Sequence, residues 1–484
     1  MLEAQLRQLL PEDCLQTSAE QNRPFEADGL SAYRSLPMIV VLPENVAQVK
    51  AVLQCCHNFK VPVVTRGAGT GLSGGALPHR QGVLLVLTKL NRILDIDPDN
   101  MTARLEPGVR NLAISEAAAI HGLYYAPDPS SQIACSIGGN VAENAGGVHC
   151  LKYGLTVNNI VKLELLTASG EPITLGGSGL DSAGFDLLSL MTGSEGMLGV
   201  VTEITVKLLP RPIQAKALLA AFASVGNACA AVADIITAGI TPGGLEMMDN
   251  TALCAAEDFA NAGYPKDAAA ILLVELDGHP LSVAAETNKV QQLLEAAGAT
   301  SIQIAKDEQQ RQRFWAGRKN AFPAVGRLSP DYYCMDGTIP RRALAEVLQY
   351  IDDLSQQYQL TVANVFHAGD GNLHPLILFD ANQPGEFEKV EEMGAKVLEK
   401  CIAVGGTITG EHGVGLEKIN QMVKQFSDQE IRQFHAIKRA LDPDDILNPG
   451  KNIPTLRRCQ EYRALQKTTH HHNNQPNGIQ ESLS

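Results

Sequence analysis

The chain has 484 residues, of which 45% are hydrophobic and 19% charged, and its formal net charge is −14. This length allows two or three domains with sizeable cores, and the composition is ordinary for a globular protein. The excess of negative charge argues against non-specific binding of nucleic acid and against docking on an acidic membrane by charge alone.

Three features of the sequence predict a cytoplasmic protein without a membrane span. The best candidate span, 217–233, is mostly alanine and contains Ser224, Gly226 and Asn227, so it is too short and too weakly hydrophobic. The ten cysteines form no CxxC pair, which favours reduced thiols, and the first residues lack the regions of a secretory signal. Any membrane contact would then be peripheral, through partner subunits.

The first part of the chain is predicted to be a helical lead-in, 1–36, followed by a domain over 37–212. In this domain apolar runs alternate with amphipathic stretches, and glycine is dense from Gly67 to Gly199, which suits a backbone packed closely against a ligand. We predict strands over 37–42, 61–65, 83–87, 102–105, 157–166 and 199–209, and helices over 45–59 and 112–120.

The composition changes after Pro210-Arg-Pro212, where a new alternation of strands and helices begins. This pattern predicts a substrate or cap domain over 213–428, then a segment over 429–456 with a helix that ends before Pro443. The polar residues 457–484 predict a disordered tail. The cap is predicted to contain strands over 217–223, 271–276 and 361–367, a helix capped by Ser224, and helices over 283–296, 339–358 and 386–404.

A glycine-rich loop, Arg66-Gly-Ala-Gly-Thr-Gly-Leu-Ser-Gly-Gly75, follows the strand predicted at 61–65. Gly69 to Gly74 formally fits GxGxxG, but the loop leads towards another strand instead of opening a helix, which excludes the Rossmann fingerprint. No GK[ST] ending is present, which excludes a Walker loop. The remaining interpretation is a nest of backbone N–H groups for a pyrophosphate.

Two short strings contain three of the twelve histidines: His367-Ala-Gly-Asp-Gly-Asn-Leu-His374 and Gly410-Glu411-His412-Gly413. Two imidazoles and a carboxylate suit a divalent metal such as zinc, and a further histidine beside them can move protons. The residues alone leave open a hydrolytic zinc site, or polar side chains satisfied by hydrogen bonds. Arg318 is either a carboxylate clamp or an ordinary arginine on a helix surface.

Further strings extend the pattern: Pro127-Asp-Pro-Ser-Ser131, Gly138-Gly-Asn140, Glu143-Asn-Ala-Gly-Gly147, Gly193-Ser-Glu-Gly-Met-Leu-Gly199 and Leu447-Asn-Pro-Gly-Lys451. Together with the glycine loop they resemble the vanillyl-alcohol-oxidase or PCMH type of FAD-binding fold, from about 37 to 451. The resemblance implies an α+β protein with an FAD-binding domain, a cap domain, and a C-terminal segment that returns to the flavin. It implies FAD contacts from Arg66, Gly67, Ala68, Gly69, Thr70, Gly71, Ser73, Gly74, Pro127, Ser131, Gly138, Gly139, Asn144, Gly146, Glu195, Gly196, Val200 and Asn448. FAD is expected to be non-covalent because the loop has no histidine.

The histidine strings resemble those of the FAD-dependent D-2-hydroxyacid dehydrogenases, which act on D-lactate, D-2-hydroxyglutarate or glycolate. This resemblance implies that His367, His374 and Glu411 bind zinc or manganese, and that His412 is the general base for the substrate hydroxyl. It also implies that Arg318 grips the substrate carboxylate while hydride passes from the α-carbon to the flavin.

The resemblance also bears on the substrate. Relatives that act on D-2-hydroxyglutarate have a lysine where this chain has Cys334 and an asparagine where it has Leu376, so partners for a second carboxylate are missing. We therefore expect glycolate or D-lactate, with D-2-hydroxyglutarate as the alternative substrate. The stretch 317–337 resembles the glycolate-oxidising branch, in which the flavoprotein works with a second flavin-fold subunit and an iron–sulfur subunit. A non-catalytic flavin-fold subunit of such a complex is the alternative role.

Overall fold

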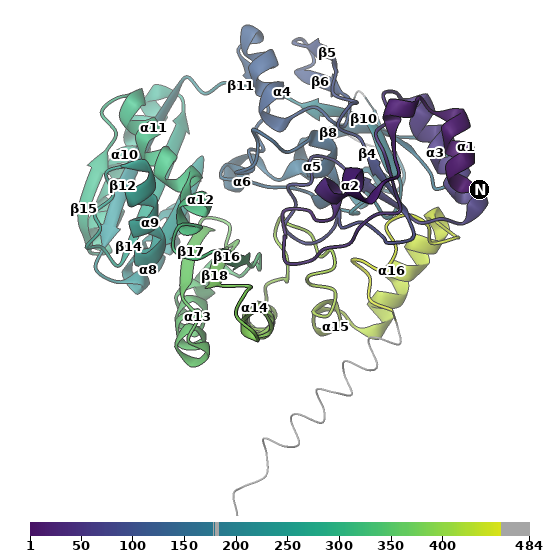
Figure 1. Cartoon of the computed structure of the whole chain (residues 1–484). Coiled ribbons are helices and arrows are strands. Elements are labelled where there is room, and N and C mark those ends of the chain that lie inside the picture. Colours follow the sequence, from purple (N-terminus) through teal and green to yellow (C-terminus); the bar gives the residue numbers. More distant parts are fainter. Residues whose placement is uncertain (178, 180–182, 456–484) are drawn as a thin grey trace, which may run out of the picture.

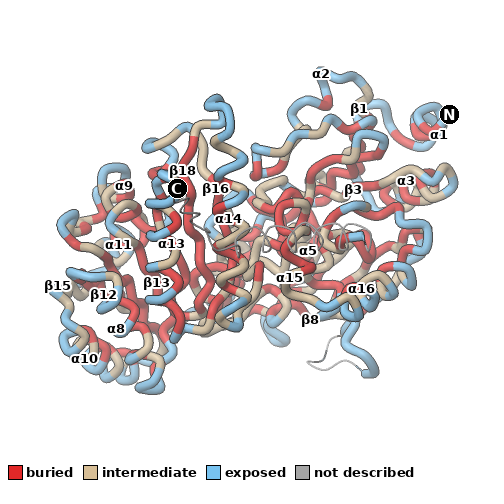
Figure 2. Tube along the Cα trace, turned by 90° about the horizontal axis from the view of Figure 1, so that it is seen from below, coloured by how far each residue is buried: buried red, intermediate tan, exposed pale blue. Residues whose placement is uncertain are grey.

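The computed structural model describes residues 1–177, 179 and 183–455, so the predicted tail over 457–484 lies outside the described residues. Figure 1 shows the two main parts side by side: a large sheet with its helices on the left, and the strands and helices of the first half on the right. In Figure 2 the strands of both parts are mostly buried, whereas the outer faces of the helices are exposed. No helix within the described ranges is long and apolar enough to span a membrane.

A small sheet at the start of the chain carries the glycine-rich loop. Its strands are β1 (Leu15–Gln16), β2 (Ile39–Val41), β4 (Val83–Val86) and β3 (Val63–Arg66), in that spatial order. The last three strands are parallel and almost fully buried, as expected for strands covered on both faces. The loop begins where β3 ends, so the backbone of residues 67–75 emerges at the carboxyl edge of the sheet.

Helix α3 (Val46–Phe59) is capped by Asn45, whose side chain accepts a hydrogen bond from the N–H of Gln48, and this confirms the predicted helix. The predicted helical lead-in is only partly helical: α1 (Leu2–Leu9) and α2 (Ala19–Asn22) flank β1. Strand β1 forms because Leu15 is buried and pairs with Val41 at the edge of the sheet. The short turns in this part are η1 (Glu12–Cys14) and η2 (Arg23–Phe25).

A second, five-stranded antiparallel sheet completes the first half. Its order is β5 (Ile93–Asp97), β6 (Thr102–Leu105), β10 (Val200–Lys207), β8 (Ile160–Leu166) and β9 (Pro172–Gly176). Residues of β10 alternate between buried and half-buried, as expected for a sheet with one core-facing side. The elements around it are α4 (Asn111–Ala118), η3 (Ala119–His121), β7 (Leu123–Tyr124), α5 (Ile137–Glu143), α6 (Cys150–Tyr153), η4 (Thr156–Asn159), α7 (Leu187–Met191) and β11 (Leu209–Pro210).

The second half is built on a seven-stranded antiparallel sheet. Its order is β15 (Ala299–Ile304), β12 (Gln214–Phe222), β14 (Ala270–Gly278), β13 (Gly244–Asp249), β17 (Val362–His367), β18 (Pro375–Phe379) and β16 (Asp331–Cys334). Alternate residues of β12 contribute to two different cores, with Leu218 in one and Leu219 in the other. Both faces of the sheet are therefore covered by helices, which explains why most residues of β12, β14, β13 and β18 are buried.

One core contains residues of α8 (Val225–Thr237), α10 (Pro280–Ala296), α13 (Leu344–Tyr358) and α14 (Glu386–Ala403). The other contains residues of α9 (Asn250–Ala260), α11 (Glu308–Lys319) and α12 (Ala321–Val325). Ser224 caps α8 by accepting from the N–H of Asn227, as predicted. Turn η5 (Arg341–Ala343) precedes α13, so the helix predicted over 339–358 begins later, at Leu344.

The C-terminal segment returns to the small sheet. After α15 (Met422–Gln425), helix α16 (Asp428–Leu441) begins with a capping box between Ser427 and Glu430. The chain then runs beside β3, where the N–H of Val63 donates to the carbonyl of Ile446 and the N–H of Asn448 donates to the carbonyl of Val63. Residues about 380 positions apart therefore meet at the base of the glycine-rich loop.

Candidate active site

A cavity of about 370 Å³ connects the glycine-rich loop with the histidine strings, and the glycine-rich strings that follow α4 also border it. A cavity of this size is in the range of cofactor and substrate sites. Of the residues predicted from the sequence, its wall contains Gly67, Ala68, Gly69, Thr70, Gly71, Ser131, Gly138, Gly139, Glu195, Gly196, Arg318, His367, His374, Glu411 and His412. The structure thus brings both predicted halves of the site to one cavity.

The other predicted FAD contacts lie outside this wall: Arg66, Ser73, Gly74, Pro127, Asn144, Gly146, Val200 and Asn448. Several of them hold the surrounding loops in place. The guanidinium of Arg66 donates to the carbonyl of Ala27, and the carbonyl of Ser73 accepts from the N–H of Leu416. The amide of Asn448 donates to the carbonyls of Gly75 and Glu195, which joins the C-terminal segment to two parts of the wall.

The glycine-rich loop fits a dinucleotide on two counts. A side chain at Gly67 would place its Cβ 2.1 Å from the hydroxyl of Ser136, so the backbone of the loop packs directly against the start of α5. Within the described part of the chain, the N–H groups of residues 68–71 donate to no backbone carbonyl. They are therefore free to bind the oxygens of a pyrophosphate.

A tight turn brings His367 and His374 together. His367 ends β17, and its N–H donates to the carbonyl of Asn372, which closes the turn. Gly371 has a φ of 83°, and a Cβ there would lie 2.1 Å from the carbonyl of Ile339, so the turn requires glycine. The two rings consequently lie 5.2 Å apart at a nearly right angle.

Glu411 completes a cluster with the two histidines. Its Oε1 lies 3.3 Å from Nε2 of His367 and 2.9 Å from Nε2 of His374. The other ring nitrogens are held from behind, His367 Nδ1 by Glu246 at 2.7 Å and His374 Nδ1 by the carbonyl of Met335 at 3.3 Å. Two oriented imidazoles and a carboxylate, with ligand atoms within 4.8 Å of one another, fit the first shell of a divalent metal.

The charges of this cluster are strongly coupled. Burial alone would lower the pKa of His367, but the carboxylates of Glu246 and Glu411 outweigh it and raise that pKa well above its usual value. Burial would raise the pKa of Glu411, whereas its contacts with His367 and His374 bring it well below the usual range. The protein therefore stabilises positive charge between these carboxylates.

Asp336 fixes the backbone of the second string, a role that sequence reasoning missed. Its carboxylate is fully buried and accepts from the N–H groups of Gly410, Glu411 and His412. Burial would raise the pKa of Asp336, but nearby positive charge, including Lys418, lowers it to about 2. This ionised carboxylate holds Glu411 and His412 at their places in the wall.

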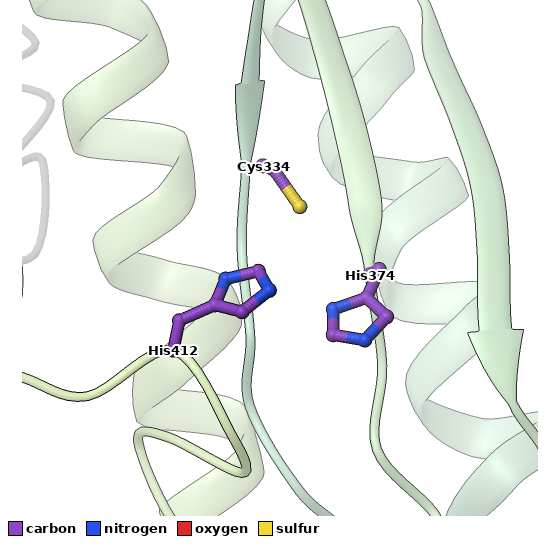
Figure 3. Close-up of side chains that lie close together, drawn as sticks. All are labelled: Cys334, His374 and His412. Atoms are coloured by element: carbon purple, nitrogen blue, oxygen red, sulfur yellow. The ribbon is translucent and has the colours of Figure 1, made fainter. Parts of the chain in front are cut away.

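His412 stacks on His374, with ring centroids 5.0 Å apart and an angle of 11° between the planes. Figure 3 shows the two rings facing each other with the thiol of Cys334 beside them, on the neighbouring strand β16. Nδ1 of His412 is buried and has no hydrogen-bond partner among the described residues, and burial lowers the pKa of this ring to about 4. A neutral imidazole thus lies next to the cluster of His367, His374 and Glu411.

Arg318 enters the wall from α11 and is bound to Glu246. Its Nε donates to Glu246 Oε2 at 2.7 Å, whereas Nη2 lies 2.7 Å from the same oxygen without hydrogen-bond geometry. Nη2 therefore has no hydrogen-bond partner within the described ranges, although the side chain is 1% exposed. A buried donor of this kind on a cavity wall suits an anionic ligand.

Glu246 is the second functional residue that sequence reasoning missed, because β13 was not predicted. Burial would raise the pKa of its carboxyl group, but His367 and Arg318 hold it below the ordinary value. The only indication in the sequence was a carboxylate between Leu245 and Met247, where a charge is unexpected in an apolar run.

The fold is similar to that of p-cresol methylhydroxylase. A solved structure of p-cresol methylhydroxylase superposes with a TM-score of 0.79 and 19% identity, covering 94% of this chain and 97% of that one. Residues 37–176 match the family model described as FAD binding domain, and 211–452 match FAD linked oxidases, C-terminal domain. The chain belongs to the FAD linked oxidases.

Two curated relatives have similar sequences over most of their length. Glycolate oxidase subunit GlcD of Escherichia coli is 67% identical, covering 92% of this chain and 89% of the relative. A D-lactate dehydrogenase of Anaerostipes hadrus is 33% identical, covering 89% of this chain and 93% of the relative. These findings confirm the predicted α+β fold, the FAD cofactor and the assignment to the FAD-dependent hydroxyacid oxidoreductases.

Proposed function

We propose that the protein oxidises a small 2-hydroxy acid, glycolate or D-lactate, to the 2-oxo acid. The observation that carries this proposal is the wall of one cavity, where Arg318, the cluster of His367, His374 and Glu411, and the ring of His412 meet the glycine-rich loop. The wall offers a cationic group for a carboxylate, ligands for a metal and an unpartnered ring nitrogen. Together these groups can bind the carboxylate of a 2-hydroxy acid, polarise its hydroxyl group and accept the hydroxyl proton.

The substrate carboxylate binds to Arg318. Nη2 is buried, cationic and without a hydrogen-bond partner in the described part of the chain, so a carboxylate would satisfy it. Glu246 accepts a hydrogen bond from Nε of the same guanidinium and thereby fixes the orientation of the group, including Nη2. The position of the carboxylate in turn determines which substrate carbon faces the cofactor.

His367, His374 and Glu411 would hold zinc or manganese, since both metals accept imidazole and carboxylate ligands. The chemistry that such a cation supplies when bound is polarisation of the substrate's hydroxyl group. His412 takes the hydroxyl proton on its unpartnered Nδ1 or on Nε2 after tautomerisation, because its ring lies beside the cluster without a partner on Nδ1. The chemistry that FAD supplies when bound is acceptance of the hydride.

A pair of cross-strand neighbours supports a small substrate. Cys334 of β16 lies opposite Leu376 of β18 in the sheet register, and both side chains are buried. Neither can pair with the second carboxylate of a longer acid, and a buried unpaired carboxylate is costly. This pair supports glycolate or D-lactate over D-2-hydroxyglutarate, in agreement with the similarity to a glycolate oxidase subunit and to a D-lactate dehydrogenase.

The similarity to a subunit of glycolate oxidase supports a role within a complex. We propose that a second flavin-fold subunit and an iron–sulfur subunit accept the electrons, because the chain has no iron–sulfur cysteine motif. FAD would be bound without a covalent link, and the complex would be cytoplasmic or peripheral to the membrane through its other subunits. Nucleic acid is not an expected partner.

Anaerobic reduction of bound FAD tests the proposal. The purified protein is mixed with glycolate, D-lactate, L-lactate or D-2-hydroxyglutarate, and bleaching of the flavin absorbance is followed. We expect fast bleaching with glycolate or D-lactate only, and a loss of at least about 100-fold in rate for His412→Ala. Bleaching by D-2-hydroxyglutarate alone would refute the argument from Cys334 and Leu376, and an equal rate for His412→Ala would favour a non-catalytic subunit.

A further inference from the structure

Glu143 is an acidic residue on the cavity wall that the proposed mechanism does not use. It is the last residue of α5, and the residue as a whole is half-buried because it borders the cavity. Its Oε2 atom, by contrast, is fully enclosed and has no hydrogen-bond partner among the described residues. A carboxylate in such a place would keep a negative charge without a compensating donor.

The position of Glu143 is defined by two glycines. A Cβ on Gly75, at the end of the glycine-rich loop, would lie 2.7 Å from Glu143 Oε1, and one on Gly413 would lie 2.0 Å from Oε2. Gly413 directly follows His412 in the chain. The carboxyl group therefore lies between the loop predicted for the pyrophosphate and the residue proposed as the base, where the cavity must hold the reactive part of the cofactor.

A second carboxylate lies close by, but in a different environment. Glu195 accepts from the N–H groups of Val414 and Gly415, each at 2.7 Å, and from the side chain of Asn452 at 2.6 Å. Its Oε1 would lie 3.0 Å from the same Cβ on Gly413. Three donors form hydrogen bonds with Glu195 and stabilise its charge, whereas no donor among the described residues forms a hydrogen bond with Glu143 Oε2.

The balance of charges around Glu143 points the same way. Burial raises its pKa well above the usual value, and Glu195 and Asp28 raise it further, whereas Lys418 and Lys451 act in the opposite direction. The two lysines are themselves engaged: Lys418 donates to the carbonyl of Gly413, and Lys451 to those of Gly75 and Leu77. Burial raises the pKa of Glu195 as well, but the N–H groups of Val414 and Gly415 and the side chain of Asn452 act against this rise. Because Glu143 has no such hydrogen bonds, it is the glutamate that carries the proton.

We propose that Glu143 presents a neutral carboxylic acid to the ring of bound FAD and tunes its reduction potential by hydrogen bonding. A neutral carboxyl group can both donate and accept, which matches the alternating N–H and carbonyl groups along the polar edge of a flavin ring. Its donor stabilises the more negative charge of reduced FAD without adding a charge of its own. The inference rests on FAD binding in this cavity and is independent of which hydroxy acid is oxidised.

The matched variants are Glu143→Gln, which keeps a neutral group that donates and accepts, and Glu143→Met, which removes both capacities at similar volume. The midpoint potential of bound FAD is measured by anaerobic reductive titration at pH 6, 7 and 8, without substrate. We expect Glu143→Gln to match the wild-type potential at each pH. For Glu143→Met we expect the equilibrium constant for reduction of bound FAD to fall at least tenfold. For a two-electron couple this lowers the midpoint potential by about 30 mV.

Three results would overturn the inference. A higher potential in Glu143→Gln would show that the wild-type group is ionised, and an unchanged potential in Glu143→Met would show that it does not interact with the ring. A different pH dependence in Glu143→Gln would show that the wild-type group titrates in this range. If Glu143→Met does not retain FAD, Glu143→Leu takes its place, and an unchanged potential in that variant would likewise overturn the inference. Glu203→Gln is the control. Glu203 lies on β10, outside the cavity wall, and pairs with Arg104, so its replacement should leave the potential unchanged.

Discussion

Glu246 and Arg318 form an ion pair in which each side chain is 1% exposed. The other oxygen of the same carboxylate lies 2.7 Å from Nδ1 of His367. One buried carboxylate thus positions both the proposed substrate clamp and a proposed metal ligand. It lies on β13, in the middle of the seven-stranded sheet, whose rigidity fixes the geometry of both.

We expect Glu246→Gln to weaken metal binding by about 10- to 100-fold, because the partner that orients the His367 ring loses its charge. It should also destabilise the fold by up to about 3–5 kcal/mol, because Arg318 remains as a buried charge without a counter-ion. Zinc and manganese titration by calorimetry measures the first effect and urea unfolding the second. Asp249→Asn, on the same strand but outside the cavity, is the control and should change metal affinity less than twofold. Equal losses of metal affinity in the two variants would contradict a positioning role of Glu246.

Removal of the metal distinguishes the proposed oxidation reaction from the alternative of a metal-dependent hydrolase. Dialysis against a strong chelator should abolish substrate-dependent bleaching while the visible absorbance of bound FAD stays, because the cluster and the glycine-rich loop are at different parts of the cavity wall. Addition of zinc or manganese should restore the rate. Full bleaching after metal removal, with the metal content verified by elemental analysis, would show that the cluster does not serve this reaction.

Gly146 offers a way to disturb the cluster without touching the loop. A Cβ at this position would lie 2.5 Å from Glu411 Oε2, so Gly146→Ala should displace that carboxylate. We expect a loss of metal affinity of about 10-fold or more with unchanged FAD content. Gly226→Ala, on α8 with open space around the added methyl group, is the matched control and should affect neither. Loss of FAD together with the metal would indicate a general collapse of the wall instead.

The buried charges around His149 predict how the stability of the fold depends on pH. His149 lies 2.9 Å from Asp128 and 3.4 Å from Glu275 of β14. Burial would lower the pKa of His149, but the two carboxylates raise it to about 10. A raised pKa means that the folded protein binds the proton more tightly than the unfolded chain, so the resulting stability is complete below about pH 6.5 and is lost as the pH approaches 10.

His149→Gln should therefore lower the free energy of unfolding at pH 6.5 by an amount on the order of 3 kcal/mol, and by much less at pH 9.5. The measurement is the urea midpoint of both proteins at the two pH values. His121→Gln, on the short turn η3, is the control for loss of an imidazole and should show no such pH dependence. A constant difference between wild type and His149→Gln would contradict the assigned shift.

The sequence was sufficient for the parts of the site that depend on local patterns. His367 and His374 are brought together by a glycine turn, and the nest of residues 67–71 follows a buried strand, so both could be predicted from spacing. Glu246 and Asp336 could not, because each acts on residues between 70 and 121 positions away through the pairing of strands. Their carboxylates show as functional only once the register of the seven-stranded sheet is known.

The same limit explains the elements that were missed. Strand β18 is a continuous apolar run, and β13 is apolar apart from Glu246 and the terminal Asp249, since helices cover both faces of their sheet. Periodicity alone does not separate such runs from buried helix. The FAD contact of Gly146 stays a prediction from its motif. The close approach of its backbone to Glu411 could not be predicted, because it spans 265 positions and no local pattern contains it.

The cross-strand pair of Cys334 and Leu376 predicts how the substrate range can be changed. In Cys334→Lys/Leu376→Asn, a cation and an amide would replace the two apolar side chains and provide partners for a second carboxylate. We expect the ratio of kcat/KM for D-2-hydroxyglutarate to that for glycolate to rise at least about tenfold, because a hydrogen bond to a charged group contributes about 1.5–3 kcal/mol. Cys334→Ser, which keeps the size, should leave the ratio near the wild-type value. An unchanged ratio in a double variant that retains FAD would show that these two positions do not face the distal end of the substrate.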